Sequence, residues 1–258
     1  MLETAVEAAR RAGRLIVERY PAEHTVNVKG YRDISTEVDA AAEGVILDLI
    51  RDRFPDHAIL SEEAGGDGIG DGYTWVVDPL DGTTNYTRRL PVFSVSIGLL
   101  EAGEPLIGVI HDPLRAQTFV AERGGGVRLA GAPVRASHVA RLDHAMVSLD
   151  WGHSDEDRGQ TLRWLTRIAP RCGTVRALGS AALALAYVAA GWLDAYLNLM
   201  MKPWDSAAGM LLVSEAGGRC TTLEGEAYRV DRPGCVATNG LIHDELLGVM
   251  RKNVKRDA

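Results

Sequence analysis

The chain has 258 residues, of which 46% are hydrophobic and 24% charged, and its formal net charge is -7. This length fits one large α/β unit with a core of ordinary size, so folding needs no disulfide or structural metal. The acidic balance argues against general nucleic-acid binding, which needs a basic surface. It does not exclude an anionic substrate, because metal ions held by carboxylates reverse the sign of the local field.

Cysteine usage and hydropathy indicate the compartment. The three cysteines, Cys172, Cys220 and Cys235, are scattered and form no Cys-x-x-Cys pair. A disulfide framework or a zinc site is therefore not expected, and free thiols fit a reducing cytoplasm. The N-terminus is amphipathic and lacks a signal-like apolar core, and no segment approaches the roughly 18 apolar residues of a membrane helix. We expect a cytoplasmic protein without a membrane or nucleic-acid partner.

The first half of the chain predicts two helices followed mainly by strands. Apolar residues at helical spacing predict helices over 2–19 and 40–53, and a proline follows each of them. Asp78 and Pro79 are expected to break a strand abruptly. The expected strands lie over 57–60, 74–77, 92–100, 106–110 and 117–121, the last three as a meander, and a glycine-rich segment without regular structure lies over 64–72.

The second half alternates between strands and helices. Strands are expected over 145–149, 175–178, 193–197 and 235–238, and helices over 158–168, 180–190, 204–215 and 241–251. Runs of strands followed by alternating units predict a layered α/β or α+β architecture. A soft boundary falls near 137–144, but its composition is not that of a linker. We therefore expect a single domain over 1–258 with two lobes that share one core.

The segment that carries most chemical information reads WVVDPLDGTTNY, from 75 to 86. An apolar strand ends in Asp78, Pro79 forces a turn, and Asp81 follows three positions after the first aspartate. Two such carboxylates and a carbonyl between them can converge on one Mg²⁺ or Mn²⁺ ion. The following Gly82 and Thr83 would begin a helix whose free N–H groups favour phosphate. An ordinary turn capped by both aspartates is the alternative.

Three more polar segments fit the same chemistry, although each has a simpler explanation by itself. Glu62 and Glu63 are adjacent, and like charges about 4 Å apart cost roughly 4 kcal/mol unless a cation lies nearby; a solvated acidic loop is the alternative. Asp205 stands at the start of an apolar helix, where aspartate is also a preferred cap. Asp39 closes the segment DISTEVD, which a helix cap would equally explain.

Taken together and in this order, these segments resemble the inositol monophosphatase family. This family belongs to the lithium-sensitive, magnesium-dependent phosphatases, which include fructose-1,6-bisphosphatases. The segment WVVDPLDGTTNY matches the first family signature, W-x-x-D-P-x-D-G-T-x-N, and WDSAAGMLLVSEAGG matches the second. The stretch RALGSAALALAYVAAGWLDAY is similar to the part of the family between them, so the resemblance covers about 29–218.

The resemblance implies a fold, an assembly and a metal centre. The fold would be a layered αβαβα sandwich of the sugar-phosphatase type, and the assembly a homodimer. Two or three Mg²⁺ ions would bind per site, with Mn²⁺ as a possible substitute. Glu62, Asp78 and the carbonyl of Leu80 would hold the first ion, and Asp78, Asp81 and Asp205 the second.

The resemblance also implies catalytic and substrate contacts. Glu62 and Thr83, the latter oriented by Asp39, would position the attacking water, and the amides of Gly82 and Thr83 would contact the phosphate. The expected substrate-binding residues are Leu80, Asp81, Gly82, Thr83, Gly179, Ser180, Ala181, Asn198 and Asp205.

One departure concerns the substrate. Inositol-specific members of the family carry an acidic residue seven positions before the aspartate of the second signature, whereas Asn198 stands there in this chain. An amide can bind a hydroxyl but brings no charge. The expected function is Mg²⁺-dependent hydrolysis of a small sugar or polyol phosphate. The alternatives are a phosphatase for fructose 1,6-bisphosphate, NADP or adenosine 3',5'-bisphosphate, and a non-catalytic regulator that binds RNA or protein.

Overall fold

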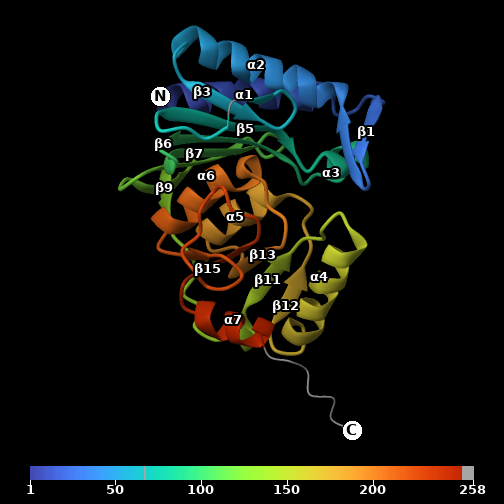
Figure 1. Cartoon of the computed structure of the whole chain (residues 1–258), viewed down its shortest axis with the longest axis vertical. Coiled ribbons are helices and arrows are strands. Elements are labelled where there is room, and N and C mark those ends of the chain that lie inside the picture. The colour runs from blue at the N-terminus through green and yellow to red at the C-terminus, as the bar shows by residue number, and fades with distance from the viewer. Residues whose placement is uncertain (67, 252–258) are drawn as a thin grey trace.

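The computed structural model describes residues 1–66 and 68–251, which form five layers (Figure 1). From top to bottom in Figure 1 these are α1 and α2, an eight-stranded sheet, α5 and α6, a five-stranded sheet, and α4 with α7. This is the αβαβα order that the resemblance implied. None of the described helices has the length and apolar character needed to span a membrane.

The outer layer contains α1 (Leu2–Arg19) and α2 (Glu37–Arg53). The first helix has the predicted bounds, but the second begins at Glu37 and not at 40. Thr36 is the reason: its hydroxyl accepts a hydrogen bond from Val38 N at 3.1 Å, and Asp39 accepts one from Thr36 N at 2.9 Å. This reciprocal cap extends the helix toward its N-terminus. It also fixes Asp39 in the first helical turn.

The eight-stranded sheet has the order β10-β9-β8-β7-β6-β5-β3-β4. The predicted meander is correct, and β3 pairs with β5 in parallel. The predicted break at Pro79 is wrong, because β5 continues to Asp81 with a register shift against β6 between Asp78 and Asp81. Such a bulge accommodates a proline that cannot donate to the ladder. The strands are β3 (Ala58–Ser61), β4 (Gly65–Gly66), β5 (Tyr73–Asp81), β6 (Ser94–Glu101), β7 (Glu104–Asp112), β8 (Gln117–Glu122), β9 (Gly126–Leu129) and β10 (Ala132–Val134).

Part of the glycine-rich segment is regular, which the sequence did not indicate. Gly65 and Gly66 form β4, which pairs antiparallel with β3. A Cβ on Gly66 would lie 2.0 Å from the carbonyl oxygen of Ile59 and φ is +151°, so only glycine fits this close approach. The prediction of no regular structure is therefore wrong for this pair. Residue 67 of the same segment lies outside the described residues.

The five-stranded sheet has the order β12-β11-β13-β15-β14. The first three strands in this order are parallel, so their carboxyl ends meet at one edge of the sheet. The outer helix α4 begins three residues before its predicted start, because Ser154 caps it by accepting from Asp157 N at 3.0 Å. The elements are β11 (Met146–Leu149), β12 (Thr174–Arg176), β13 (Ala195–Asn198), β14 (Arg219–Thr221), β15 (Cys235–Thr238), α4 (Asp155–Ile168), α7 (His243–Arg251) and the short η1 (Leu142–His144).

The middle layer is packed tightly on glycines of the first sheet. It consists of α5 (Ala181–Ala189) and α6 (Pro203–Glu215), close to their predicted bounds. A Cβ on Gly108 would lie 2.6 Å from the carbonyl oxygen of Ala208, and one on Gly98 would lie 2.8 Å from the Cβ of Ala207. The backbone of α6 therefore rests directly on β6 and β7. This contact brings the start of α6 to the end of β5.

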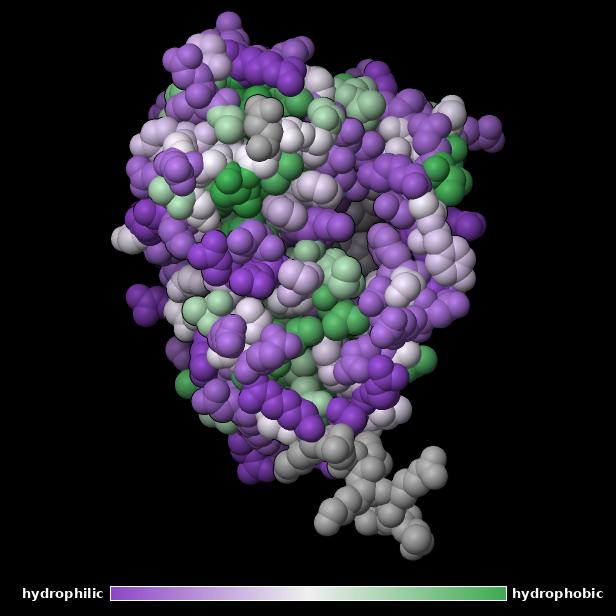
Figure 2. Space-filling view, in the orientation of Figure 1, coloured by the Kyte–Doolittle hydropathy of each residue, from purple (hydrophilic) through white to green (hydrophobic). Residues whose placement is uncertain are grey.

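A hairpin that the sequence did not predict connects the two halves. Strands β1 (Val26–Gly30) and β2 (Asp33–Thr36) form a separate two-stranded sheet beside the short helix α3 (Thr83–Thr87). At its tip, Arg32 forms an ion pair with Asp155 at 2.9 Å and donates to the carbonyl of His153 at 3.1 Å, at the start of α4. Figure 2 shows that the surface on this side is hollowed between the half carrying β1 and the half carrying α4.

Candidate active site

The end of β5 places two carboxylates in the interior. Asp78 and Asp81 are only 2% and 7% exposed. Asp78 accepts a hydrogen bond from Leu80 N at 3.0 Å, and the carbonyl of Leu80 accepts one from the Thr83 hydroxyl at 2.9 Å. Gly82 has φ +89°, and a Cβ there would lie 2.9 Å from the carbonyl oxygen of Val92. The bulge, the turn and this glycine together direct the carbonyl and both aspartates into one region.

Asp81 also caps the helix α5, a role that the sequence did not indicate. Its carboxylate accepts hydrogen bonds from the amides of Ala181 and Ala182, both at 3.1 Å, and from the hydroxyl of Ser180. A carboxylate at a helix start satisfies free N–H groups and interacts favourably with the helix dipole. The predicted substrate residues Ser180 and Ala181 therefore contact the predicted metal ligand Asp81.

Asp39 and Thr83, predicted as partners, lie within hydrogen-bonding distance. The Thr83 hydroxyl is 2.9 Å from Asp39 Oδ1, across 44 positions of sequence. The same hydroxyl is 2.9 Å from the carbonyl of Leu80, so its single proton has two available acceptors. Burial raises the pKa of Asp39 to about 6, and hydrogen bonds from Thr36 and Thr83 oppose this rise. The cap of α2 therefore supports the side chain that orients Thr83.

Glu62 lies in the loop after β3 and is paired with a cation from the hairpin. Lys29 Nζ is 2.7 Å from Glu62 and 2.8 Å from Glu63. The buried Glu43 holds the loop itself, because it accepts from the amides of Glu63 and Ala64 at 3.2 Å and 3.0 Å. The cation expected beside the adjacent glutamates is therefore supplied in part by Lys29. Lys29 lies in β1, and no local sequence pattern indicated that it pairs with Glu62 and Glu63.

The position of Asp205 is compatible with both of the roles considered for it in the sequence. Its carboxylate accepts from Lys202 N at 2.8 Å, which caps α6, and the side chain is only half-buried. Desolvation, together with the charges of Asp81 and Glu62, raises the pKa of Asp205 to about 8, against the hydrogen bond from Lys202. Helix capping and membership of the carboxylate cluster are therefore compatible.

The carboxylates act on one another electrostatically. Burial raises the pKa of Asp78 well above its usual value, and the charges of Glu62, Asp81 and Asp205 add to the effect. Burial also raises the pKa of Asp81 to about 6, although Ser180 and two backbone amides stabilise its charge. Buried like charges of this kind favour the binding of a cation, which removes their repulsion.

The donor set fits a hard divalent ion. Four carboxylates, from Glu62, Asp78, Asp81 and Asp205, and the carbonyl of Leu80 are the oxygen ligands that Mg²⁺ and Mn²⁺ prefer. Within residues 1–66 and 68–251, no three acidic, histidine or cysteine side chains are already arranged to hold a metal. All four carboxylates make hydrogen bonds or ion pairs within the protein instead. These contacts would be exchanged for metal contacts on binding.

Asn198 belongs to a hydrogen-bonded chain at the edge of the second sheet. Its amide nitrogen donates to Tyr196 Oη at 2.9 Å, and Tyr196 donates to Asp150 Oδ2 at 2.8 Å. Asp150 Oδ1 accepts from the amide of Gly179 at 2.9 Å. The sequence analysis identified Asn198 and Gly179 but missed Asp150 and Tyr196. Asp150 could have been proposed from the sequence, because an aspartate directly after an apolar strand is a common position for a site residue.

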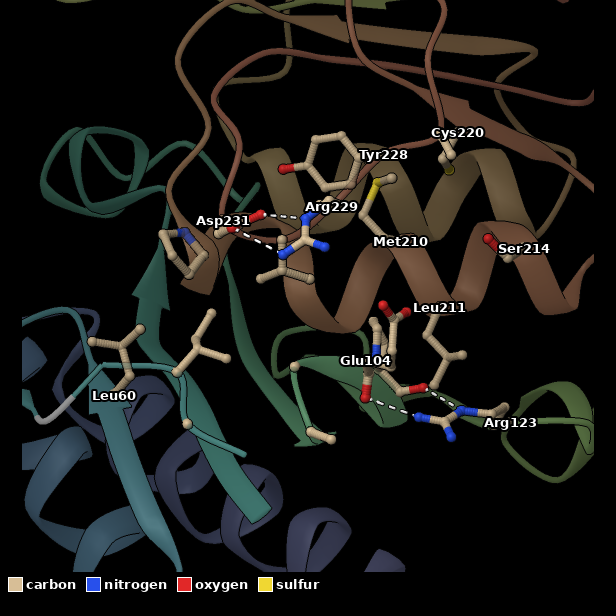
Figure 3. A pocket seen from close by; sticks show the side chains of 18 of the residues that line it. Leu60, Glu104, Arg123, Met210, Leu211, Ser214, Cys220, Tyr228, Arg229 and Asp231 are labelled. Atoms are coloured by element: carbon tan, nitrogen blue, oxygen red, sulfur yellow. Dashed lines mark hydrogen bonds and ion pairs between the residues drawn. The ribbon is translucent and has the colours of Figure 1, made fainter. Parts of the chain in front are cut away.

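A separate cavity lies along α6 (Figure 3). It has a volume of about 860 Å³, and no predicted site residue lines it. Two of the arginines that line it are paired within the protein: Arg229 pairs with Asp231 at 3.0 Å, and Arg123 donates to the carbonyl of Glu104 at 2.9 Å.

Comparison with known proteins agrees with this arrangement. The sequence profile of the inositol monophosphatase family matches residues 1–255. The chain belongs to the inositol monophosphatase family. Among curated relatives, Nus factor SuhB of Escherichia coli (strain K12) is 40% identical over 255 residues, covering 97% of this chain and 96% of that protein.

Other members of the inositol monophosphatase family align over similar lengths. The fructose-1,6-bisphosphatase/inositol-1-monophosphatase of Thermotoga maritima is 36% identical over 258 residues, covering 98% of this chain and 97% of that protein. The crystal structure of the extragenic suppressor protein suhB from Bartonella henselae has a TM-score of 0.93 at 34% identity and covers 98% of both chains. The αβαβα architecture is therefore shared with solved members of the family.

Proposed function

We propose that this protein is a Mg²⁺-dependent phosphomonoesterase that hydrolyses a small sugar or polyol phosphate through water activated by two metal ions. The observation that carries the proposal is the group of interacting carboxylates, Glu62, Asp78, Asp81 and Asp205, in a chain of the inositol monophosphatase family. Burial and mutual repulsion raise the pKa of Asp78, which favours a site that binds cations. Phosphate ester hydrolysis is a reaction that benefits from such cations.

The proposed reaction assigns a role to each group in the cluster. Bound Mg²⁺ would neutralise the phosphate, increase the acidity of a water and stabilise the entering and leaving oxygens. Thr83 donates its only proton to Asp39 or Leu80 O, so its lone pairs can accept a hydrogen bond from the attacking water. Glu62 would accept the other proton of that water once Lys29 and the metal share its charge. No covalent nucleophile is required.

The substrate contacts would come from both halves of the molecule. The amides of Gly82 and Thr83 would bind the phosphate, and Leu80, Asp81 and Asp205 would contact it through their metal ligation. Gly179, Ser180, Ala181 and Asn198 would surround the organic part. Because Ser180 and Ala181 bond to Asp81, binding of the organic part and of the phosphate would be coupled.

Two alternatives follow from the names of the relatives. The Thermotoga maritima relative is named for both fructose-1,6-bisphosphatase and inositol-1-monophosphatase, which keeps sugar bisphosphates among the candidate substrates. The Escherichia coli relative is named a Nus factor, so a non-catalytic role is the second alternative. The presence of all five predicted metal-ligating groups favours the phosphatase.

The test is phosphate release from a panel of esters at neutral pH, with Mg²⁺ and with EDTA. The panel contains inositol 1-phosphate, fructose 1,6-bisphosphate, NADP, adenosine 3',5'-bisphosphate and histidinol phosphate. We expect Mg²⁺-dependent turnover led by a polyol or sugar phosphate. Absence of turnover for every ester, with folded protein and bound Mg²⁺ demonstrated, would refute the enzymatic proposal in favour of the non-catalytic alternative.

A further inference from the structure

The carboxyl ends of three parallel strands meet on the substrate side of the site. Asp150 follows β11, Gly179 lies shortly after β12, and Asn198 ends β13. This edge faces the end of β5, because Ser180 and Ala181 bond directly to Asp81. The charge of Asp150 also contributes to the raised pKa of Asp81. Asp150 is only partly buried, so its carboxylate is not sealed in the core.

The hydrogen bonds along this edge have a defined direction. Asn198 Oδ1 accepts from the amide of Met200 at 2.9 Å, so its nitrogen must face Tyr196. Because the amide donates to Tyr196 Oη, the single phenolic proton is directed to Asp150 at 2.8 Å. A carboxylate at position 198 would compete for that proton. The amide at 198 and the carboxylate at 150 therefore complement each other as the donor to Tyr196 and the acceptor from it.

The carboxylate of Asp150 retains acceptor capacity after these bonds are made. Its two oxygens together have about four lone-pair sites. Tyr196 occupies one site on Oδ2 and Gly179 one site on Oδ1. Each oxygen therefore keeps one site for a donor from outside the protein. Two acceptor oxygens held rigidly side by side suit adjacent hydroxyl groups.

We propose that Asp150 is a specificity-determining residue, whose carboxylate binds neighbouring hydroxyl groups in the organic part of the substrate. The proposal rests on the proposed phosphatase function and specifies its substrate class as esters of polyols or sugars with adjacent free hydroxyls. Tyr196 and Asn198 are positioning residues in this arrangement, because they act through Asp150. In this arrangement Asn198 sets the direction of the hydrogen bonds through Tyr196 to Asp150. It does not take over the substrate contact of the acidic residue found in inositol-specific members of the family.

The first experiment compares Asp150→Asn with the wild type on inositol 1-phosphate and on phenyl phosphate, which has no hydroxyl group. Loss of hydrogen bonds to a charged group predicts a fall in kcat/KM on inositol 1-phosphate of about 10- to 100-fold, mainly through KM. The fall on phenyl phosphate should be at least about ten times smaller. Equal falls on both esters would overturn the proposal, since they would show that Asp150 only supports the loop at Gly179.

The second experiment exchanges the pair in the double variant Asp150→Asn/Asn198→Asp. Both hydrogen bonds of Tyr196 can then form in the reverse direction, while the amides of Gly179 and Met200 still donate, so the double variant should have a higher Tm than Asn198→Asp alone. The ratio of kcat/KM values for inositol 1-phosphate and fructose 1,6-bisphosphate should change, because the charge has moved. A double variant with the wild-type ratio would contradict the proposal. A wild-type protein that hydrolyses no ester of the panel described above would contradict the phosphatase function itself.

Discussion

Acidic side chains with two structural relationships characterise the site at the residue scale. Asp81 and Asp205 each cap a helix of the middle layer and each belong to the carboxylate cluster. The capping bonds hold the side chains in place without a metal, while the charges of the neighbouring carboxylates repel one another. This arrangement stores electrostatic repulsion at the point where a cation would relieve it.

Replacing Asp205 by asparagine should separate these roles. The side-chain oxygen of Asp205→Asn can still accept from Lys202 N, so the cap of α6 should remain. The lost charge should lower kcat by about 100-fold or more, because the metal site contributes several kcal/mol to transition-state stabilisation. Phosphate release at saturating Mg²⁺ measures the effect.

The control for this variant is Asp157→Asn. Asp157 occupies the same third position in the cap of α4, where it accepts from Ser154 N, and it lies far along the chain from the cluster. It should keep nearly full activity with a similar Tm. Near-normal turnover by Asp205→Asn would show that this residue is not a metal ligand.

The raised pKa values of the cluster predict how pH affects stability. The pKa values of Asp81 and Asp205 rise to about 6 and about 8, above those of an unfolded chain near 4. The folded protein therefore binds more protons than the unfolded chain between these pH values, so this cluster's contribution to stability falls as pH rises from about 4 to about 8. Because Mg²⁺ binds the ionised form, it should raise Tm more at pH 8 than at pH 5. Thermal unfolding with EDTA and with Mg²⁺ checks this, and a larger Mg²⁺ effect at pH 5 would contradict it.

The sequence predicted the residues of the site better than their partners. Asp78, Leu80, Asp81 and Thr83 lie within one short segment whose local geometry follows from proline and glycine. Lys29 and Asp150 were missed as partners because their contacts join Lys29 to Glu62 across 33 positions and Asp150 to Gly179 across 29. Such pairings depend on tertiary packing, which a local pattern does not encode.

At the scale of elements, the contact between α6 and the first sheet depends on glycines in β6 and β7, which have no side chain. Gly108→Ala would place a Cβ 2.6 Å from the carbonyl oxygen of Ala208, where backbone would have to move. We expect a loss of about 1–3 kcal/mol in the free energy of unfolding, as for other overpacked cores. Urea unfolding measures it.

Gly44→Ala is the matched control for this substitution. Gly44 lies within α2, and a Cβ there would meet no atom within 4 Å. Alanine should therefore stabilise the protein by up to about 1 kcal/mol through helix propensity. Equal effects of the two substitutions would show that the glycine contact under α6 does not limit packing.

Element boundaries were predicted well where apolar periodicity decided them and poorly where side-chain bonds did. The first helix matched at both ends, whereas α2 and α4 began earlier because Thr36 and Ser154 cap them. The hairpin of β1 and β2 was missed because β1 is exposed along its whole length and shows no alternation. The end of β5 was missed because a bulge can carry a strand past proline.

At the scale of the whole molecule, the hairpin tip joins two halves that otherwise meet through the middle layer. Arg32→Ser removes the ion pair with Asp155 and the bond to His153 O. Because the pair is exposed, the global free energy of unfolding should change by less than about 1 kcal/mol. Local opening should increase, and limited proteolysis within 24–35 should be faster.

The control for the hairpin is Arg141→Ser. Arg141 pairs only locally in the described contacts, with Asp143 two positions away, and its side chain is 70% exposed against 29% for Arg32. Its loss should leave cleavage within 24–35 at the wild-type rate. Unchanged cleavage in Arg32→Ser would show that the hairpin is held by its base and by Lys29 alone.

The double role of Asp81 constrains how descendants of this protein could lose the proposed phosphatase activity. A mutation at Asp81 removes the cap of α5 as well as charge from the cluster, so selection for a stable chain keeps the residue even when catalysis no longer matters. Glu62 bears no comparable structural duty, since its described side-chain partner is the exposed Lys29. In homologues that have only a regulatory function, we therefore expect Glu62 to be substituted earlier than Asp81, because Asp81 is also needed to cap α5.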